Sequence, residues 1–287
     1  MKYRNRVAVV TGAGSGIGRA LTIALAADGA RVAASDIDAA GLAATSAACA
    51  PGSVATYHLD VADRAAVRAH AEQVRADLGP ASMLFNNAGV DLMAEIESME
   101  PADLDWLFGI NFGGVVNGTT AFLPQLIEAG SADRPARLIN LSSAFGLIAV
   151  PAQGAYCASK FAVRGLTETL RQEMIMNDRP VTVHCVHPGV VKTNFGKNMR
   201  TSAEDAEVAR TLFDKAALTT PERTARTILR GVDRGKARIL VGPDGRIAAA
   251  LPRLLGVSYT TLLARGSRVT SRRRTANPPS VEERNPL

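Results

Sequence analysis

The stretch Val7-Ala8-Val9-Val10-Thr11-Gly12-Ala13-Gly14-Ser15-Gly16-Ile17-Gly18 decides the fold of this chain of 287 residues. Its first four residues are apolar and mostly β-branched, a pattern that predicts a buried parallel strand. The alanine- and leucine-rich residues 19–27 predict a helix, closed by Asp28-Gly29. A glycine-rich loop between a strand and a helix is typical of a site where a pyrophosphate meets the free N–H groups of the helix N-terminus. The alternative is a tight turn that binds no ligand.

Six further apolar segments, most of them followed by a segment of helical propensity, predict the remaining strands. They comprise residues 31–35, 54–58, 83–85, 137–141, 181–187 and 238–241. Strands that alternate with helices predict an α/β fold in which a doubly wound parallel sheet of about seven strands binds its ligand at the strands' carboxyl ends. We expect a single domain over residues 1–242, an apolar extension over 243–264 and a basic, disordered tail over 265–287.

Residues 101–128 predict one long helix that Pro124 kinks near its end. Gly113, Gly114 and Gly118 each cost about 1 kcal/mol in a helix interior, so we expect close packing against another backbone there, and the glycines also suggest packing against another subunit. Shorter helices are predicted over residues 63–77, 156–176 and 221–232. The mostly polar residues 194–220 suit a mobile lid over a site.

The composition is that of a folded, water-soluble domain. Hydrophobic residues make up 47% of the chain and charged residues 21%. The net charge is +6, but six arginines and only two glutamates lie beyond residue 264, so the body is close to neutral. A charge excess confined to one tail, without a recognition motif, does not predict a nucleic-acid partner.

The cysteines and histidines predict no metal centre. Cys49, Cys157 and Cys185 lack metal-ligand spacing, and their odd number argues against a disulfide framework. His184 and His187 match no metal pattern, so we expect buried or turn-capping roles. Residues 1–6 are too short and too charged for a signal peptide, and no uncharged apolar run approaches the roughly 18 residues of a membrane span. These features predict a reduced, cytoplasmic compartment.

Asp36 follows the second predicted strand, 18 residues beyond the last glycine of the loop. A carboxylate there accepts hydrogen bonds from the ribose hydroxyls of an adenosine and repels a 2′-phosphate. Neither Ser15 nor Ile37 supplies a cation for such a phosphate, so NAD is favoured over NADP. The alternative role of Asp36 is to cap the next helix, for which Asp38 is better placed.

Small polar residues follow several other predicted strands. Asn86-Asn87-Ala88-Gly89 follows the fourth strand, Ser142-Ser143 the fifth and Pro188-Gly189 the sixth. Such residues suit a backbone that passes close to a ligand, although asparagines also stabilise turns. Asp60 either faces an adenine or caps a turn, and Asn111 is a polar residue in an apolar neighbourhood, which a satisfied core amide would also explain.

Tyr156 and Lys160 lie four residues apart and therefore share one face of the predicted helix. A neighbouring ammonium favours the phenolate form of a tyrosine and lowers a pKa that is ordinarily about 10, which makes the phenol useful in proton transfer. Taken alone, this spacing also occurs by chance on many helices.

The motifs together resemble the short-chain dehydrogenase/reductase family. The resemblance covers about residues 5–242, leaves out the last 45 or so, and is most specific where Ser143 precedes Tyr156 by 13 residues and Lys160 follows by four. It implies a Rossmann-type fold and a homodimer or homotetramer. The residues that carry it are the loop from Thr11 to Gly18, Asp36, Asp60, Asn86-Asn87-Ala88-Gly89, Asn111, Ser143, Tyr156, Lys160, Pro188-Gly189 and Thr193.

The resemblance implies specific roles for these positions. Tyr156 resembles the family's general acid-base, Lys160 its partner toward the nicotinamide ribose, Ser143 the group that binds the reacting oxygen, and Asn111 the residue that positions a proton relay. Val191 and Thr193 would meet the carboxamide. The full implied cofactor set is Gly12, Ser15, Gly16, Ile17, Gly18, Asp36, Asp60, Val61, Asn87, Ala88, Gly89, Tyr156, Lys160, Pro188, Gly189, Val191 and Thr193.

The sequence thus predicts an NAD-dependent oxidoreductase that transfers a hydride between nicotinamide and a secondary alcohol or ketone. Segments 90–95, 144–153 and 194–213 would line the pocket by analogy, and their apolar and amide side chains favour a hydrophobic substrate of steroid, lipid or terpenoid type. Alternatives are an NADP-dependent carbonyl reductase and a dinucleotide-binding regulator without turnover. Residues 247–263, which precede the clustered arginines, either lie on an anionic membrane or pack on the body or a partner subunit.

Overall fold

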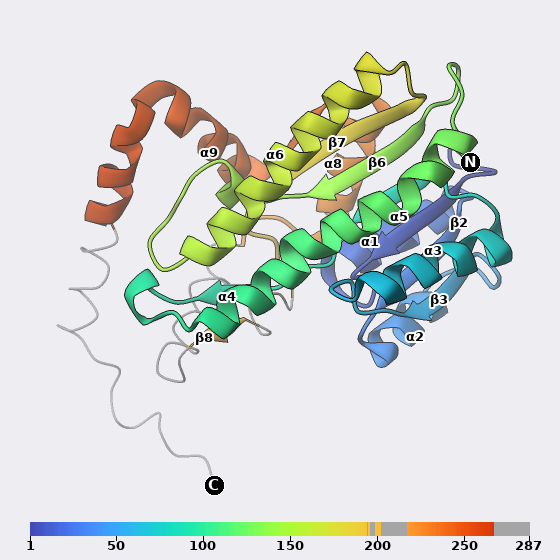
Figure 1. Ribbon diagram of the computed structural model, residues 1–287, viewed down its shortest axis with the longest axis horizontal. Helices are drawn as coiled ribbons and strands as arrows, with labels where there is room; N and C mark the ends of the chain where they lie inside the picture. The colour runs from blue at the N-terminus through green and yellow to red at the C-terminus, as the bar shows by residue number, and fades with distance from the viewer. Residues whose placement is uncertain (194, 196–198, 202–216, 267–287) are drawn as a thin grey trace, which may run out of the picture.

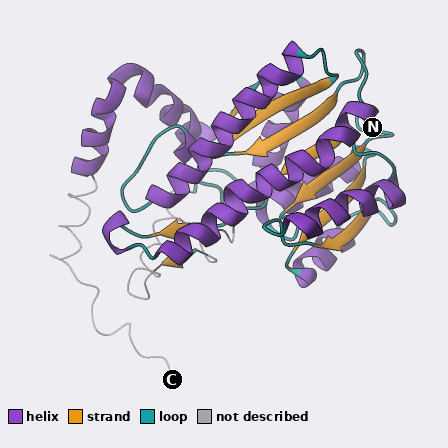
Figure 2. Cartoon of the chain, in the orientation of Figure 1, coloured by secondary structure: helices purple, strands orange, loops and turns teal. Residues whose placement is uncertain are grey.

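Seven parallel strands form the centre of the structure, a computed structural model that describes residues 1–193, 195, 199–201 and 217–266 (Figures 1 and 2). Their order across the sheet is β3-β2-β1-β4-β6-β7-β9, so the chain runs outward in one direction from β1 and in the other from β4. The predicted doubly wound sheet is therefore confirmed. The strands are β1 (Val7–Thr11), β2 (Arg31–Asp36), β3 (Val54–His58), β4 (Met83–Asn86), β6 (Ala136–Leu141), β7 (Val181–Pro188) and β9 (Arg238–Val241).

Helices cover both faces of the sheet because its buried strands send alternate side chains to opposite sides. On one face, Ala8 and Val10 of β1 belong to a core that includes residues of α1 (Gly16–Ala27) and α8 (Pro221–Asp233). On the other face, Val7 and Val9 belong to a core with residues of α3 (Arg64–Leu78), α5 (Gly114–Ala129) and α6 (Gly154–Met176). The sheet is thus a rigid platform whose carboxyl-terminal edge can carry a site.

Side-chain caps fix the start of several helices. Asp63 accepts hydrogen bonds from the N–H groups of Ala65 and Ala66 at the start of α3. Asp38 caps α2 (Ala39–Ala47) by accepting from Gly41 at 2.9 Å, as its position in the sequence indicates. Thr220 does the same for α8 by accepting from Arg223.

The predicted long helix over residues 101–128 is interrupted. It consists of α4 (Pro101–Phe108), a π-helical turn η2 (Gly109–Gly113) and α5. The prediction of a regular helix with a kink at Pro124 missed this turn, which widens the helix at the buried Asn111. A π-helical turn inside a helix often marks a functional position, because it redirects one side chain.

Two glycines of this helix pack closely against the chain's own side chains. A β-carbon at Gly114 would lie 2.6 Å from Cγ2 of Val61, and one at Gly118 would overlap the amide of Asn86. Close packing is therefore present at Gly114 and Gly118, but against side chains and not against the backbone that we expected, while a β-carbon at Gly113 would have only an ordinary contact of 3.5 Å with Phe108 O. Since these contacts within the chain account for both glycines, the two positions do not indicate a contact with a second subunit.

The C-terminal segment Gly242–Gly266 is helical and arches away from the sheet in Figure 1. It contains α9 (Gly242–Leu255), the short turn η5 (Gly256–Ser258) and residues 259–266. One face packs on the body through Ala248 and Tyr259, whereas Leu254 and Val257 are 79% and 80% exposed. Among the described residues it is the helical stretch whose length and composition would allow it to cross a membrane.

Most of the predicted lid lies outside the described residues. Arg200–Thr201 forms β8, which pairs in parallel with β5 (Leu92–Met93) beside the carboxyl edge of the main sheet. Arg200 also stacks 3.7 Å from the centre of the Trp106 ring and bonds Asp103 at 2.6 Å. These contacts tie the described part of this segment to α4. The remaining short helical turns are η1 (Ile96–Ser98) and η3 (Ala144–Gly146).

Candidate active site

The site lies where the carboxyl ends of β1 and β4 meet, which is the point where the strand order reverses. Thr11 joins the two loops that leave these strands, since its Oγ1 accepts from the N–H groups of Asn87 and Ala88, both at 3.0 Å. The Asn87 amide donates back to the carbonyl of Thr11 at 2.8 Å. The predicted glycine loop and the Asn-Ala-Gly loop therefore form one wall.

The glycine loop has the backbone that a bound pyrophosphate requires. Gly12 and Gly16 have φ values of +66° and +52°, in the left-handed region that favours glycine. A β-carbon at Gly12 would lie 2.9 Å from Cα of Ala88. The N-cap residue of α1, Ser15, makes no side-chain cap hydrogen bond, so the first N–H groups of this helix are available to an anion. The loop therefore fits the pyrophosphate of a dinucleotide.

Asp36 faces the same loop from the end of β2. Its Oδ2 accepts from Gly14 N at 2.8 Å and its Oδ1 from Asp38 N at 3.0 Å. Arg19, which the sequence argument did not weigh, also reaches this loop, but its guanidinium donates to the carbonyl groups of Gly14 and Gly41 and to Thr45. The Asp36 carboxylate is thus held at this end of the cavity, where it can meet a ribose.

Asp60 and Val61 line the same end of the cavity. Asp60 accepts from Ala62 N at 2.9 Å, so it caps its turn while lying at the cavity wall. The carbonyl of Val61 accepts from the Asn117 amide of α5 at 3.0 Å. Both roles of Asp60 that the sequence allowed are therefore compatible with its position.

Tyr156, Lys160 and Ser143 meet at the other end of the cavity. Tyr156 and Lys160 are 8% and 4% exposed, and the Lys160 ammonium lies 5.6 Å from the centre of the Tyr156 ring. Lys160 donates to the carbonyl of Leu141 at 3.2 Å, which anchors α6 to the end of β6. The predicted sharing of one helix face by Tyr156 and Lys160 is thus present in the structure.

Burial dominates the electrostatics of this group. It raises the pKa of Tyr156 above its usual value, the charge of Asp91 raises it further, and a hydrogen bond with the Ser143 side chain lowers it. Burial lowers the pKa of Lys160 to about 8, against an upward influence of Asp91. The expected lowering of the phenol pKa by Lys160 is therefore not present in this structure, where the Ser143 hydrogen bond is the influence that lowers it and burial prevails.

The π-helical turn places Asn111 behind these residues. Its amide bonds the backbone of Val90 and donates to Ser159 Oγ at 3.3 Å. A β-carbon at Gly89 would lie 3.0 Å from Asn111 Oδ1 and 3.3 Å from Lys160 Nζ. Gly89 therefore lets the loop after β4 pass between the amide and the ammonium.

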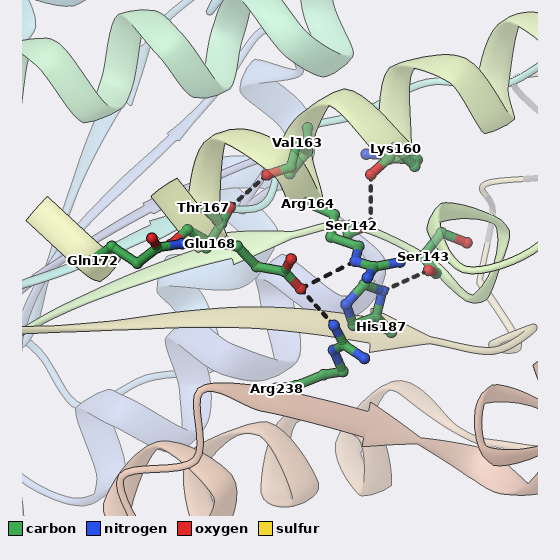
Figure 3. A network of polar contacts seen from close by, with 10 residues as sticks. All are labelled: Ser142, Ser143, Lys160, Val163, Arg164, Thr167, Glu168, Gln172, His187 and Arg238. Carbon is green, nitrogen blue, oxygen red and sulfur yellow. Dashed lines mark hydrogen bonds and ion pairs between the residues drawn. The ribbon is translucent and has the colours of Figure 1, made fainter. Parts of the chain in front are cut away.

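A polar network behind Ser143 holds the end of β6 in place, as Figure 3 shows. His187 Nδ1 lies 2.8 Å from the Ser143 carbonyl, and burial lowers the pKa of His187 to about 4, so a neutral imidazole donates this bond. Ser142 Oγ donates to the carbonyl of Lys160 at 2.8 Å. The expectation that His187 and His184 are structural is met, since His184 bonds Lys236 and Thr182.

The loop after β7 closes the cavity from the C-terminal side. Pro188, Gly189, Val191 and Thr193 line it, and Thr193 Cγ2 would lie 3.1 Å from a β-carbon at Gly16. Asp244, in the first turn of α9, accepts from Val190 N at 2.6 Å. The cofactor-side loop and the C-terminal helix are therefore fastened together.

The cavity between these walls has a volume of about 650 Å³. Three of the four predicted catalytic residues, Ser143, Tyr156 and Lys160, line it, whereas Asn111 does not. Every predicted cofactor residue lines it except Gly18, which lies within α1. The sequence predicted that residues 90–95 line the pocket with mostly apolar and amide side chains, whereas the structure places the carboxylate of Asp91 in that wall. The sequence did not predict that the C-terminal segment forms part of the cavity wall, and its signal was the apolar character of residues 247–263. We call this part the C-terminal wall; it consists of Ile247, Ala248, Leu251 and Leu263.

Comparisons with known proteins agree with this geometry. The sequence profile of the short chain dehydrogenase family matches residues 6–204. The chain is 46% identical over 268 residues to the putative oxidoreductase SadH of Mycobacterium tuberculosis, covering 92% of this chain and 96% of that protein. It is 33% identical over 231 residues to the 3-oxoacyl-acyl-carrier-protein reductase FabG of Thermotoga maritima, covering 80% and 91%.

A solved structure is similar over the same span. The crystal structure of a short chain dehydrogenase/reductase from Burkholderia phymatum in complex with NAD has a TM-score of 0.81 and 28% identity, covering 88% of this chain and 94% of that one. A Rossmann-type sheet with a dinucleotide loop and a tyrosine-lysine pair defines an oxidoreductase that uses a nicotinamide cofactor. The chain belongs to the short-chain dehydrogenase/reductase family and is an NAD(P)-dependent enzyme acting on CH–OH groups.

Proposed function

We propose that the protein is an NAD-dependent dehydrogenase that interconverts a hydrophobic secondary alcohol and its ketone. The observation that carries this proposal is one continuous cavity, with the glycine loop and Asp36 at one end and Tyr156, Ser143 and Lys160 at the other. Such a cavity holds the dinucleotide and the substrate side by side. A bound nicotinamide would supply the acceptor or donor of the hydride.

The side chains supply orientation and proton transfer. In the direction of oxidation, the Tyr156 phenolate would take the hydroxyl proton of the alcohol and become the phenol, and a bound NAD⁺ would accept the hydride. Release of the phenol proton to solvent then completes the balance, in which alcohol and NAD⁺ give ketone, NADH and one proton. Ser143 donates a hydrogen bond to the reacting oxygen. The Lys160 ammonium, fixed by Leu141, binds the nicotinamide ribose and favours the phenolate.

Asp36 and Arg19 support NAD as the cofactor. The carboxylate is positioned by Gly14 N and Asp38 N to accept from ribose hydroxyls, and it would repel a 2′-phosphate. Arg19 is a cation of this loop, but it donates to backbone carbonyls and Thr45, and so it is engaged elsewhere. NADP would thus meet a negative charge that Arg19 does not offset.

The substrate end of the cavity supports a hydrophobic molecule. The rings of Phe145 and Phe195 meet the Tyr156 ring edge to face, with centroids 6.3 Å and 6.0 Å away. Ile148 and the residues of the C-terminal wall extend this surface. Burial of apolar surface against these side chains would contribute most of the binding free energy.

The test is turnover by the purified full chain with NAD and a panel of secondary alcohols, followed by the absorbance of the reduced cofactor. Tyr156→Phe should lose activity by about 100-fold to 10,000-fold while still binding NAD, because it removes the proton-transfer group. Tyr57→Phe is the matched control, since Tyr57 bonds Asp77 away from the cavity. No turnover of any alcohol, or a Tyr156→Phe variant as active as the parent, would overturn the proposal.

We further propose that the protein contacts anionic membranes through the exposed face of Gly242–Gly266. Leu254 and Val257 lie on this face, Arg253 is exposed beside Leu254, and the chain continues into clustered arginines. The parent should float with vesicles containing phosphatidylserine, whereas the double variant Leu254→Glu, Val257→Glu should not. Ile175→Glu on α6 is the control, and an unbound parent would exclude the contact. We also propose that the protein is cytoplasmic and forms a homodimer or homotetramer. Light scattering after gel filtration measures the mass of the assembly and so tests this proposal.

A further inference from the structure

Asp91 is a buried carboxylate in the wall of the substrate cavity, and it belongs to none of the motifs that carry the family resemblance. It follows Val90 in the loop after β4, lines the cavity and is 5% exposed. Burying a carboxylate is costly unless donors satisfy its oxygens. An under-bonded charge in a cavity is therefore a candidate for a role in binding.

The Asp91 carboxylate has few donors among the described residues. Its Oδ1 accepts from the neighbouring Leu92 N at 2.9 Å, and its Oδ2 has a long contact of 3.5 Å with the Gln153 amide. A carboxylate has room for about four hydrogen bonds. The Gln153 Oε1 atom is itself buried without a partner in the described part of the chain. The wall carboxylate of Asp91 and the Gln153 amide that contacts it therefore both lack donors among the described residues.

The carboxylate is not needed to hold its loop. The Asn111 amide already bonds both backbone groups of the preceding Val90. The Asp91 carbonyl accepts from Arg200 N at 3.1 Å, where β5 meets β8. An apolar or amide side chain could occupy the position without loss of these backbone bonds. The charge thus requires an explanation other than folding.

The electrostatic neighbours of Asp91 indicate what kind of partner is missing. Burial raises the pKa of Asp91 to about 6, and the hydrogen bonds from Leu92 and Gln153 and the charge of Lys160 offset this effect only in part. The charge of Asp91 in turn acts on Tyr156, Cys157 and Lys160. The same end of the cavity already holds the buried Lys160 ammonium, so a substrate cation beside Asp91 would lie near a like charge. The missing partner is therefore a neutral hydrogen-bond donor.

We propose that Asp91, with Gln153 behind it, binds a second hydroxyl group of the substrate on a carbon near the one whose oxygen meets Tyr156. The inference rests on the proposed dehydrogenase function and narrows its substrate class to hydrophobic diols and the corresponding hydroxyketones. The hydroxyl donates to the Asp91 carboxylate, while the aromatic walls contact the rest of the molecule. A substrate without the hydroxyl leaves the buried charge short of donors and binds more weakly.

The test compares two alcohols that differ in one hydroxyl, decan-2-ol and decane-1,2-diol, with the full chain and NAD. The parent should prefer the diol by about 10-fold to 100-fold in kcat/KM, as expected for a hydrogen bond to a charged group. Asp91→Leu should bring the ratio to within about twofold, mainly through a higher KM for the diol. Asp91→Asn keeps one acceptor and should retain part of the preference.

Asp105→Asn, an exposed carboxylate of α4, is the matched control and should keep the parent's ratio. Dissociation constants of both alcohols for the enzyme with NADH, measured by cofactor fluorescence, give a readout that does not need turnover or a fully active variant. A parent that turns over or binds both alcohols equally overturns the inference while leaving the dehydrogenase proposal intact. A stronger preference for 1-aminodecan-2-ol than for the diol overturns the neutral-donor assignment.

Discussion

The side-chain amide of Asn111 bonds both backbone groups of Val90: Oδ1 accepts from Val90 N at 2.8 Å and Nδ2 donates to Val90 O at 2.9 Å. This pairing mimics a strand partner, although Asn111 lies in a π-helical turn. The two hydrogen bonds hold Val90 in place, and with it the loop that continues into Asp91. The position of the substrate wall therefore depends on one side chain of the helix.

Replacing Asn111 by Leu should impair both stability and activity. The change leaves two partly buried backbone groups of Val90 without their Asn111 partner, which costs up to about 1–3 kcal/mol for each group. We expect a lower urea midpoint and a kcat reduced by at least about tenfold, because the loop beside Tyr156 is released. Asn177→Ala, at the exposed end of α6, is the control. A fully active, fully stable Asn111→Leu variant would contradict this view of the pairing.

Replacing Asp36 by Ala should weaken the preference for NAD. Loss of a charged acceptor for the ribose hydroxyls should raise the KM for NAD by about 10-fold to 100-fold, and loss of the repulsion should lower the KM for NADP. Asp38→Ala removes the cap of α2 instead and should lower stability by about 1 kcal/mol without changing the cofactor ratio. Steady-state kinetics with both cofactors distinguish the two carboxylates.

Two glycine substitutions should have opposite effects on the free energy of unfolding. A β-carbon at Gly18 would overlap the Gly12 carbonyl and lie 2.6 Å from Asn87 Nδ2, so Gly18→Ala should destabilise the protein and lower its affinity for NAD. Gly165 is exposed in α6, with no atom within 4 Å of such a β-carbon, so Gly165→Ala should stabilise by about 0.5–1 kcal/mol. Urea denaturation measures both, and equal effects would show that the loop is not closely packed.

The protein should lose stability as the pH falls from about 6.5 toward 4. Burial lowers the pKa of His70, His184 and His187 to about 4 each, below the ordinary value near 6.5. In this window the unfolded chain binds protons that the folded chain does not, so stability is full above the unfolded pKa and declines below it. Each histidine contributes up to about 1.4 kcal/mol per pH unit.

A variant at His70 tests this assignment. His70 lies between the rings of Tyr57 and Phe122, with centroid distances of 4.8 Å and 5.8 Å, so His70→Phe preserves an aromatic contact and removes one titrating group. The dependence of the unfolding free energy on pH should become shallower by about one proton. An unchanged slope between pH 6.5 and 4 would assign the acid sensitivity to other groups.

The sequence predicted those parts of the protein whose reasons are local. The loop from Gly12 to Gly18 follows a strand and precedes a helix, and the spacing of Tyr156 and Lys160 places them on one face, so both could be recognised without the fold. Asp38 was correctly preferred over Asp36 as the cap of α2 for the same reason. Most of the seven strands were found because they are buried apolar runs, whereas β3 lies at the sheet edge and of its five residues only Tyr57 is buried.

The features that the sequence did not predict depend on contacts between distant segments. The π-helical turn at Asn111 is stabilised by bonds to Val90 and Ser159, which no local pattern records. Asp91 looks like an ordinary loop acid until its burial and its contact with Gln153 are known. The C-terminal wall was missed because apolar residues of an amphipathic helix do not indicate which surface they cover.

The bond from Asp244 to Val190 N joins the start of α9 to the loop that closes the cofactor end of the cavity. Gly189 and Gly242 make room for that carboxylate, since a β-carbon at either position would overlap it. For protein engineering, this contact makes Val241 a suitable point at which to exchange the C-terminal segment of the chain. A designer who exchanges it for the C-terminal segment of a relative can alter substrate scope and leave the dinucleotide half untouched, provided that the aspartate and the two glycines are retained.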